Sequence, residues 1–116
     1  MSGDLSNEIF TEIYQAHLDY MVLVFRDQHL DREQHKVFGR RFGRLHVHPT
    51  NHVGTRDDEI LVVKTSAKST YTAGDTWHTD VTCDEYPPLG SMLYITETPE
   101  CGGGDTLYAD LSLIHI

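Results

Sequence analysis

The chain has 116 residues, enough for one small domain with a modest hydrophobic core. Its formal net charge of −9 argues against a nucleic-acid partner, because phosphate binding requires clustered Lys and Arg side chains. Cys83 and Cys101 form no C-x-x-C pair, no apolar run reaches the ~18 residues of a membrane span, and no signal peptide precedes the chain. We therefore expect a cytoplasmic protein with free thiols and no membrane contact.

Two segments have the apolar spacing of amphipathic helices and a recognisable first residue. Residues 5–18 place apolar side chains three or four positions apart, and Ser6 is a candidate N-cap. A second helix is predicted to begin at Asp31, which has the spacing of a capping box with Gln34, and to continue to Phe42. Both helices are predicted to pack outside a sheet.

Six further segments are rich in β-branched, aromatic and other apolar residues, which is the composition of β-strands. Residues that favour turns, such as Gly, Pro, Asn and Asp, separate most of these segments. Together with the two helices, they predict a mostly β protein with flanking helices. The segments are residues 20–25, 45–49, 60–64, 74–82, 89–96 and 105–109.

His78 and Asp80 lie two positions apart in one predicted strand. Side chains two apart in a strand leave the same face, so both can reach one metal ion. An imidazole and a carboxylate are two thirds of the 2-His-1-carboxylate triad that binds Fe(II) in non-haem oxygenases. The spacing alone is a weak motif, because it also occurs at His17 and His29, next to or within predicted helices. The alternative interpretation is a His and an Asp at a strand edge that are solvated or hydrogen-bonded to the backbone.

Four motifs follow one another along the chain. They are the segment 5–28, F-G-R-R-F-G-R-L-H-V-H-P at 38–49, W-H-T-D-V-T at 77–82, and P-P at 87–88 followed by G-G-D-T-L-Y at 103–108. In this order they resemble the TauD/TfdA, or taurine dioxygenase, family. The resemblance implies an Fe(II)- and 2-oxoglutarate-dependent dioxygenase that uses O₂ and has a double-stranded β-helix, or jelly-roll, core.

The resemblance implies a role for three residues at the metal. His78 and Asp80 match iron ligands of the family, and Thr106 matches a threonine that hydrogen-bonds a carboxylate of 2-oxoglutarate. Without the resemblance, the preferred interpretation of Thr106 is a β-branched residue that fills a strand. The protein would supply ligand geometry and exclude water, while the metal and its co-substrate supply the oxidative chemistry.

The resemblance also implies a substrate pocket for a small anionic molecule. His48 matches a histidine that contacts the anionic head group, and Val81 and Cys83 are expected to line the pocket. Asn51 and Gly74 stand where the taurine enzyme has a tyrosine and an asparagine, and Cys83 replaces a phenylalanine. We therefore expect a sulfonate other than taurine, a sulfate ester, an aryloxyacetate or a different carboxylate as the substrate.

A second grouping of histidines remains open in the sequence. His46, His48 and His52 are close enough along the chain to form a zinc or iron site of their own. Pro49 ends the predicted strand between them, and we favour contact with the substrate head group as the role of His48.

Two parts of the family site have no match in this chain. The family's second iron-binding histidine and the arginine that pairs with 2-oxoglutarate lie downstream of G-G-D-T, beyond residue 116. We therefore expect residues 1–116 to be the N-terminal part of a single dioxygenase domain, a truncated jelly roll that is inactive alone and prone to associate as a homo-oligomer. The alternatives are a non-catalytic metal- or anion-binding module and an inactive fragment.

Overall fold

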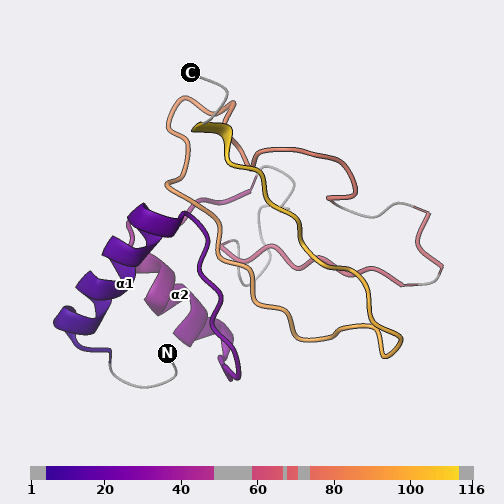
Figure 1. Cartoon of the computed structure of the whole chain (residues 1–116), viewed down its shortest axis with the longest axis horizontal. Coiled ribbons are helices and arrows are strands. Elements are labelled where there is room, and N and C mark those ends of the chain that lie inside the picture. Colours follow the sequence, from indigo (N-terminus) through magenta and orange to yellow (C-terminus); the bar gives the residue numbers. More distant parts are fainter. Residues whose placement is uncertain (1–4, 49–58, 67, 71–73, 113–116) are drawn as a thin grey trace.

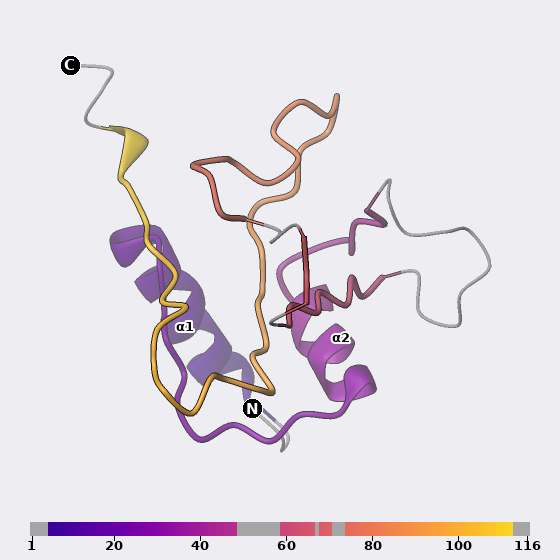
Figure 2. The same ribbon diagram turned by 90° about the vertical axis from the view of Figure 1, so that its right-hand side faces the viewer.

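Two helices form the ordered framework of this computed structural model. They are α1 (Asn7–Tyr20) and α2 (Arg32–Arg40). They lie side by side at one side of the molecule, and the rest of the described chain runs as extended segments and turns (Figures 1 and 2). The structure describes residues 5–48, 59–66, 68–70 and 74–112.

Both helices begin at the caps that the sequence predicts. The Ser6 hydroxyl oxygen accepts a hydrogen bond from the Ile9 N–H at 3.3 Å, which satisfies a backbone donor in the first turn of α1. The Asp31 carboxylate accepts from the Gln34 N–H at 2.8 Å, and the Gln34 amide oxygen accepts from the Asp31 N–H at 2.9 Å. The predicted capping box of α2 is therefore confirmed. α2 ends at Arg40, two residues before the predicted end.

An aromatic cluster holds the two helices together. The ring of Phe10 in α1 packs edge-on against Phe42 at 5.0 Å and against Phe38 at 6.5 Å between ring centroids. Tyr14 lies 6.0 Å from Phe42. Phe38 is 6% exposed and is the one buried hydrophobic residue in the part of the chain that the structure describes. The core of the described chain is thus a small cluster between α1 and α2.

Arg41 fastens the start of α1 to the end of α2. Its guanidinium donates to the Leu5 carbonyl at 2.6 Å and to the Asn7 side-chain oxygen at 2.7 Å. The guanidinium carbon also lies 4.2 Å from the centroid of the Phe10 ring, within cation–π range. One arginine therefore connects a helix start, a helix end and the aromatic cluster.

The prediction of a mostly β, jelly-roll fold is wrong for the described residues, which contain the two helices and no strand. Most described residues of the segments with strand composition lie outside regular secondary structure and are drawn without arrows in Figure 1. Residues 74–82 contain turns and bends instead of a strand, and Tyr20 belongs to α1. Backbone hydrogen bonds outside the helices close turns, as from the Asp84 N–H to the Val81 carbonyl at 3.1 Å. Strand composition becomes a strand only beside a paired neighbour, because β-propensity reflects cross-strand packing and burial.

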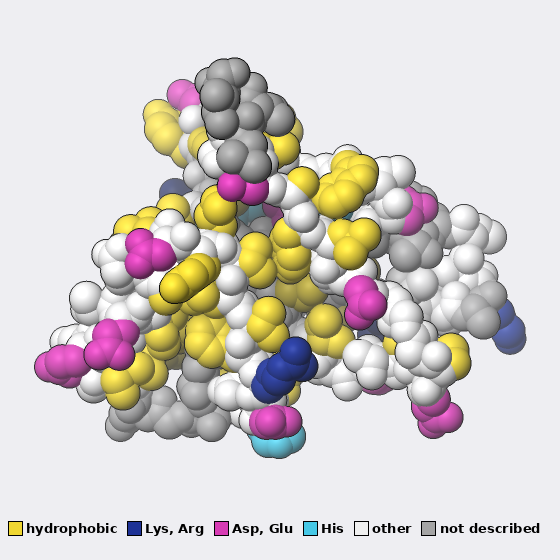
Figure 3. All heavy atoms as spheres, viewed as in Figure 1, with side chains coloured by type: hydrophobic (Ala, Val, Ile, Leu, Met, Phe, Trp, Pro, Cys, Tyr) yellow, Lys and Arg dark blue, Asp and Glu magenta, His cyan; other side chains and the backbone are white. Residues whose placement is uncertain are grey.

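The described chain exposes most of its large apolar side chains. A folded monomer of 13.2 kDa is expected to expose about 6,400 Å², whereas this chain exposes 10346 Å². Its radius of gyration of 15.7 Å likewise exceeds the roughly 13 Å expected for its length. Figure 3 shows hydrophobic side chains spread over the visible face. Neither described helix is long and apolar enough to cross a membrane.

Tyr94 connects the segment 91–95 to the turn that precedes α2. Its hydroxyl donates to the Gln28 carbonyl and accepts from the Leu30 N–H, each at 3.2 Å, and its ring lies 6.1 Å from His35. The hydroxyl therefore satisfies both a donor and an acceptor of this turn. Its loss would leave these partly buried backbone groups without that partner.

We expect Tyr94→Phe to loosen this turn locally. Loss of the hydroxyl should cost about 1 kcal/mol, which corresponds to roughly fivefold faster hydrogen exchange at the Leu30 amide. Amide exchange followed by NMR measures this directly. The matched control is Tyr108→Phe, because the Tyr108 side chain is 63% exposed. Equal exchange at Leu30 in both variants would contradict the prediction.

Candidate functional site

His78 is held by the backbone carbonyl of the residue two positions before it. Its Nδ1–H donates to the Thr76 carbonyl at 2.7 Å. A carbonyl oxygen only accepts, so this contact places the hydrogen on Nδ1, and the neutral ring then has its lone pair on Nε2. Gly74 comes close to the ring with a φ of +84°, and a Cβ there would lie 3.4 Å from His78 Cε1. The local chain thus selects which imidazole nitrogen is available to a metal.

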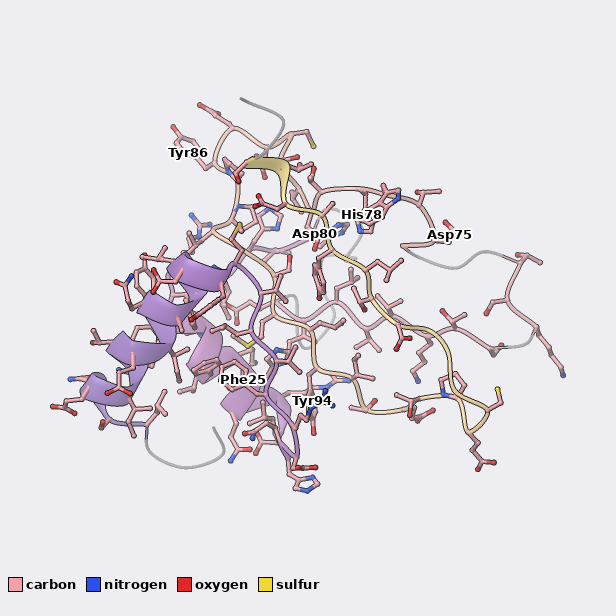
Figure 4. The ribbon with its side chains drawn as sticks, viewed as in Figure 1. Phe25, Asp75, His78, Asp80, Tyr86 and Tyr94 are labelled. Carbon is pink, nitrogen blue, oxygen red and sulfur yellow. The ribbon has the colours of Figure 1, made fainter. Side chains whose placement is uncertain are left out.

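Asp80 presents one carboxylate oxygen to His78 and the other to a serine. Asp80 Oδ1 lies 3.4 Å from His78 Nε2, and Asp80 Oδ2 accepts from the Ser91 hydroxyl at 2.6 Å. The side chains of His78 and Asp80 are 52% and 54% exposed, and Figure 4 shows them close together. The expected proximity of the pair is confirmed, although no strand carries it, because Asp80 lies in a bend.

The spacing of the two facing atoms suits one metal ion. Two ligand atoms each about 2.1 Å from a cation lie roughly 3.0 Å apart at a right angle and about 3.4 Å apart at the tetrahedral angle. The observed 3.4 Å falls within this range. It exceeds the about 2.7–2.9 Å of a charge-assisted N–H···O hydrogen bond, so the two atoms make no short hydrogen bond with each other. The donor set of imidazole nitrogen and carboxylate oxygen fits two positions of an Fe(II) site.

The described residues bring together no group of three potential metal ligands. His46, one member of the alternative histidine grouping, instead contacts Asp84. His52 lies outside the described residues, so the three-histidine site stays a prediction. Asn51, a predicted difference from the taurine enzyme, lies outside them too. His48 is half-buried, and its expected contact with the substrate head group also stays a prediction.

Three other predicted site residues, Val81, Cys83 and Thr106, lie within the described part of the chain. Val81 follows Asp80 directly with a φ of 52° and is half-buried, and Cys83 is exposed in the same turn. Thr106 is exposed, and no hydrogen bond joins it to His78 or Asp80 in the described part of the chain. The structure therefore places Val81 beside the pair and leaves the predicted role of Thr106 untested.

His46 and Asp84 form a second contact that the sequence did not predict. His46 Nε2 lies 3.0 Å from Asp84 Oδ2, so the imidazole N–H donates to the carboxylate across 38 positions of the chain. This hydrogen bond, aided by the Glu85 backbone N–H, lowers the pKa of Asp84. The contact fixes the turn that follows Asp80 to the segment that follows α2.

The lowered pKa of Asp84 predicts a defined pH dependence. A carboxyl whose pKa is lowered by folding stabilises the folded state above the unfolded pKa of about 3.9, and that contribution is lost as the pH falls through the lowered value. We expect the Asp84 carboxyl to titrate below about 3.9, and its midpoint to rise in His46→Ala. An NMR titration of the Asp84 carboxyl carbon tests this, and equal midpoints in both proteins would contradict it.

Sequence reasoning missed Ser91 and the His46–Asp84 contact for the same reason. Ser91 lies 11 positions after Asp80, and His46 lies 38 positions before Asp84. Such contacts depend on the tertiary path of the chain, and no spacing rule for helices or strands covers them. The local signal between Asp80 and Ser91 was Pro87-Pro88, which indicates a turn or an extended linker.

Comparisons with known proteins identify relatives. A family model described as "Taurine catabolism dioxygenase TauD, TfdA family" matches residues 2–115. An alpha-ketoglutarate-dependent sulfonate dioxygenase of Saccharomyces cerevisiae is 32% identical over 92% of this chain and 28% of its own length. An (S)-phenoxypropionate/alpha-ketoglutarate-dioxygenase of Sphingobium herbicidovorans is 32% identical over 94% of this chain and 39% of its own length.

An alpha-ketoglutarate-dependent sulfate ester dioxygenase of Pseudomonas putida is 34% identical over 99% of this chain and 37% of its own length. The chain thus spans well under half the length of these curated relatives. No solved structure matches the chain.

Proposed function

Because the chain belongs to the TauD, TfdA family of taurine catabolism dioxygenases, we propose that the whole protein is an Fe(II)- and 2-oxoglutarate-dependent dioxygenase. It hydroxylates a small anionic organic substrate, with O₂ as the oxidant and 2-oxoglutarate as co-substrate. The observation that carries this proposal is the facing pair His78 Nε2 and Asp80 Oδ1, 3.4 Å apart. These atoms are the two available ligand atoms of a half-exposed His–Asp pair.

In this proposal the chain's own residues position the reactants. His78 and Asp80 hold the iron, and the Thr76 carbonyl keeps the hydrogen on Nδ1 so that Nε2 binds metal. The bound iron, together with 2-oxoglutarate, supplies the O₂-dependent oxidation. Thr106 donates its hydroxyl to a carboxylate of 2-oxoglutarate.

The substrate side of the proposal rests on three residues and on the relatives. His48 donates an imidazole N–H to the anionic head group, while Val81 and Cys83 line the pocket. The relatives' names include a sulfonate, a sulfate ester and phenoxypropionate, which all carry an anionic group. Gly74 and Cys83, which stand where the taurine enzyme has larger residues, favour a substrate other than taurine.

A substrate panel tests this function. The full-length protein receives Fe(II), 2-oxoglutarate and O₂ together with taurine, a longer alkylsulfonate, an alkyl sulfate or phenoxypropionate, and succinate is measured. We expect succinate formation that depends on all three additions and is fastest with an anionic substrate other than taurine. Taurine as the fastest substrate would refute the specificity.

A second candidate function is a non-catalytic metal- or anion-binding module. It is favoured by the observation that the described residues bring together two metal ligands and no third. The same panel separates the two functions. Metal binding that depends on His78, without succinate formation from any substrate, would favour the binding module over the enzyme.

A further inference from the structure

We propose that Ser91 is a positioning residue for Asp80, whose hydroxyl holds Oδ2 so that Oδ1 faces His78 Nε2 and the metal. This inference rests on the proposed function, because it assigns a task to Ser91 only if the pair binds iron. The Ser91 hydroxyl donates to Asp80 Oδ2 at 2.6 Å, a length typical of strong hydrogen bonds to a carboxylate.

The contact with Ser91 spans a turn of the chain. Between Asp80 and Ser91 lie the turn closed by the Asp84 N–H and the Val81 carbonyl, and then Pro87-Pro88. The hydroxyl therefore reaches the carboxylate through the tertiary path of the chain. A contact made in this way fixes the carboxylate relative to a second segment.

The two proposed ligands are oriented by the same device. In each side chain, the atom on the far side from the other ligand, called the outer atom here, makes a hydrogen bond. His78 Nδ1 bonds the Thr76 carbonyl at 2.7 Å, and Asp80 Oδ2 bonds the Ser91 hydroxyl at 2.6 Å. The inner atoms, Nε2 and Oδ1, then face each other at 3.4 Å. Metal sites use outer partners of this kind to fix the orientation of their ligands.

Exposure makes the hydrogen bond from Ser91 more important for Asp80. The Asp80 side chain is 54% exposed, so packing leaves much of its rotation unrestrained. Without the hydroxyl, the carboxylate can rotate, exchange its two oxygens and offer both to the metal. A single bound oxygen leaves more coordination positions for co-substrate and O₂, as an open oxygenase site requires.

A pair of variants isolates the hydroxyl. Thr and Val have nearly the same shape, so Ser91→Thr and Ser91→Val differ mainly in the presence of a hydroxyl. Ser69→Ala is a matched control, because the Ser69 hydroxyl accepts from the Ser66 N–H at 2.9 Å and belongs to another turn. Affinity of the full-length protein for Fe(II) is measured without O₂. Co(II) then reports the coordination geometry through its visible absorption.

We expect Ser91→Val to bind Fe(II) about 10–100-fold more weakly than Ser91→Thr, in line with the usual effect of losing an outer partner of a metal ligand. The Co(II) spectrum of Ser91→Val should differ from that of the unmodified protein, whereas Ser91→Thr and Ser69→Ala should match it. The rise in melting temperature on adding metal should shrink only in Ser91→Val, because that rise follows metal affinity.

The outcomes separate this inference from the function on which it rests. Equal Fe(II) affinities and equal Co(II) spectra for Ser91→Val and Ser91→Thr would overturn the role of Ser91 and leave the function intact. Metal binding that is unaffected by His78→Ala would overturn the proposed function and this inference together.

Discussion

Replacing His78 by alanine should lower the affinity for Fe(II) by more than about 10–100-fold and abolish succinate formation. That range is the usual effect of removing an outer partner of a metal ligand, and His78→Ala removes a proposed ligand itself. Asp80 would then be the one side chain of the pair still able to bind the iron, and water would take the place of the imidazole. The measurement is Fe(II) affinity without O₂, followed by succinate formation with O₂ and 2-oxoglutarate.

The chain contains a matched control for this variant. His29 has the same H-x-D spacing, with Asp31 two positions later, and is exposed. The Asp31 carboxylate serves as the N-cap of α2, so this second H-x-D match has a structural task instead. We expect His29→Ala to leave Fe(II) affinity and succinate formation unchanged. Equal losses in His29→Ala and His78→Ala would contradict the assignment of the metal to His78.

Residues 1–116 expressed alone should bind an apolar dye strongly and unfold without a sharp transition. The chain exposes roughly 4,000 Å² more surface than expected for a folded monomer of its mass, and Phe38 is the one buried hydrophobic residue in its described part. Exposed apolar surface of this kind binds dyes such as ANS and promotes association. ANS fluorescence, calorimetry and sedimentation together measure these properties.

A compact globular protein of similar mass is the control for this measurement. It should bind little ANS and show a cooperative calorimetric transition, because a stable domain buries its apolar surface. A monodisperse monomer of residues 1–116 that unfolds cooperatively and leaves ANS dark would contradict the prediction. It would mean that the exposed segments are covered by contacts within these residues.

The two helices were predictable because their signals are local. Ser6 and Ile9 are three positions apart, as are Asp31 and Gln34, and each pair makes the hydrogen bond that its spacing predicts. The ends were less predictable. Tyr20 had been predicted as the first residue of a strand, on the composition of the apolar run that follows it. In the structure α1 extends to Tyr20, because the helical hydrogen bonds outweigh a weak local preference for extended chain.

The strands could not be inferred from composition alone. Residues such as Val62 and Val63 have high β-propensity, yet both are exposed in extended chain. A strand forms when a neighbouring segment pairs with its backbone and covers a face, and that neighbour can lie far away in sequence. Propensity therefore identified extended segments but not a sheet.

The candidate site was predictable in part. The two-residue spacing of His78 and Asp80 predicted that they lie together, and they do, although a turn residue at Gly74 and bends at Thr76 and Asp80 replace the expected strand. The contacts of Ser91 and Asp84 could not be predicted. Ser91 contacts Asp80 from 11 positions away, and Asp84 contacts His46 from 38 positions away, so local spacing gives no signal for either contact. Local spacing thus predicts that His78 and Asp80 lie together more readily than it predicts the distant residues that contact them.

The most direct test is to locate the iron. Crystals of the full-length protein grown without O₂ in the presence of Fe(II) would show the metal by anomalous diffraction at the iron edge. We expect one strong peak about 2.1 Å from both His78 Nε2 and Asp80 Oδ1, with Asp80 Oδ2 still bound by Ser91. An iron peak bound elsewhere, for example at His46 and Asp84, with His78 and Asp80 uncoordinated, would contradict this assignment.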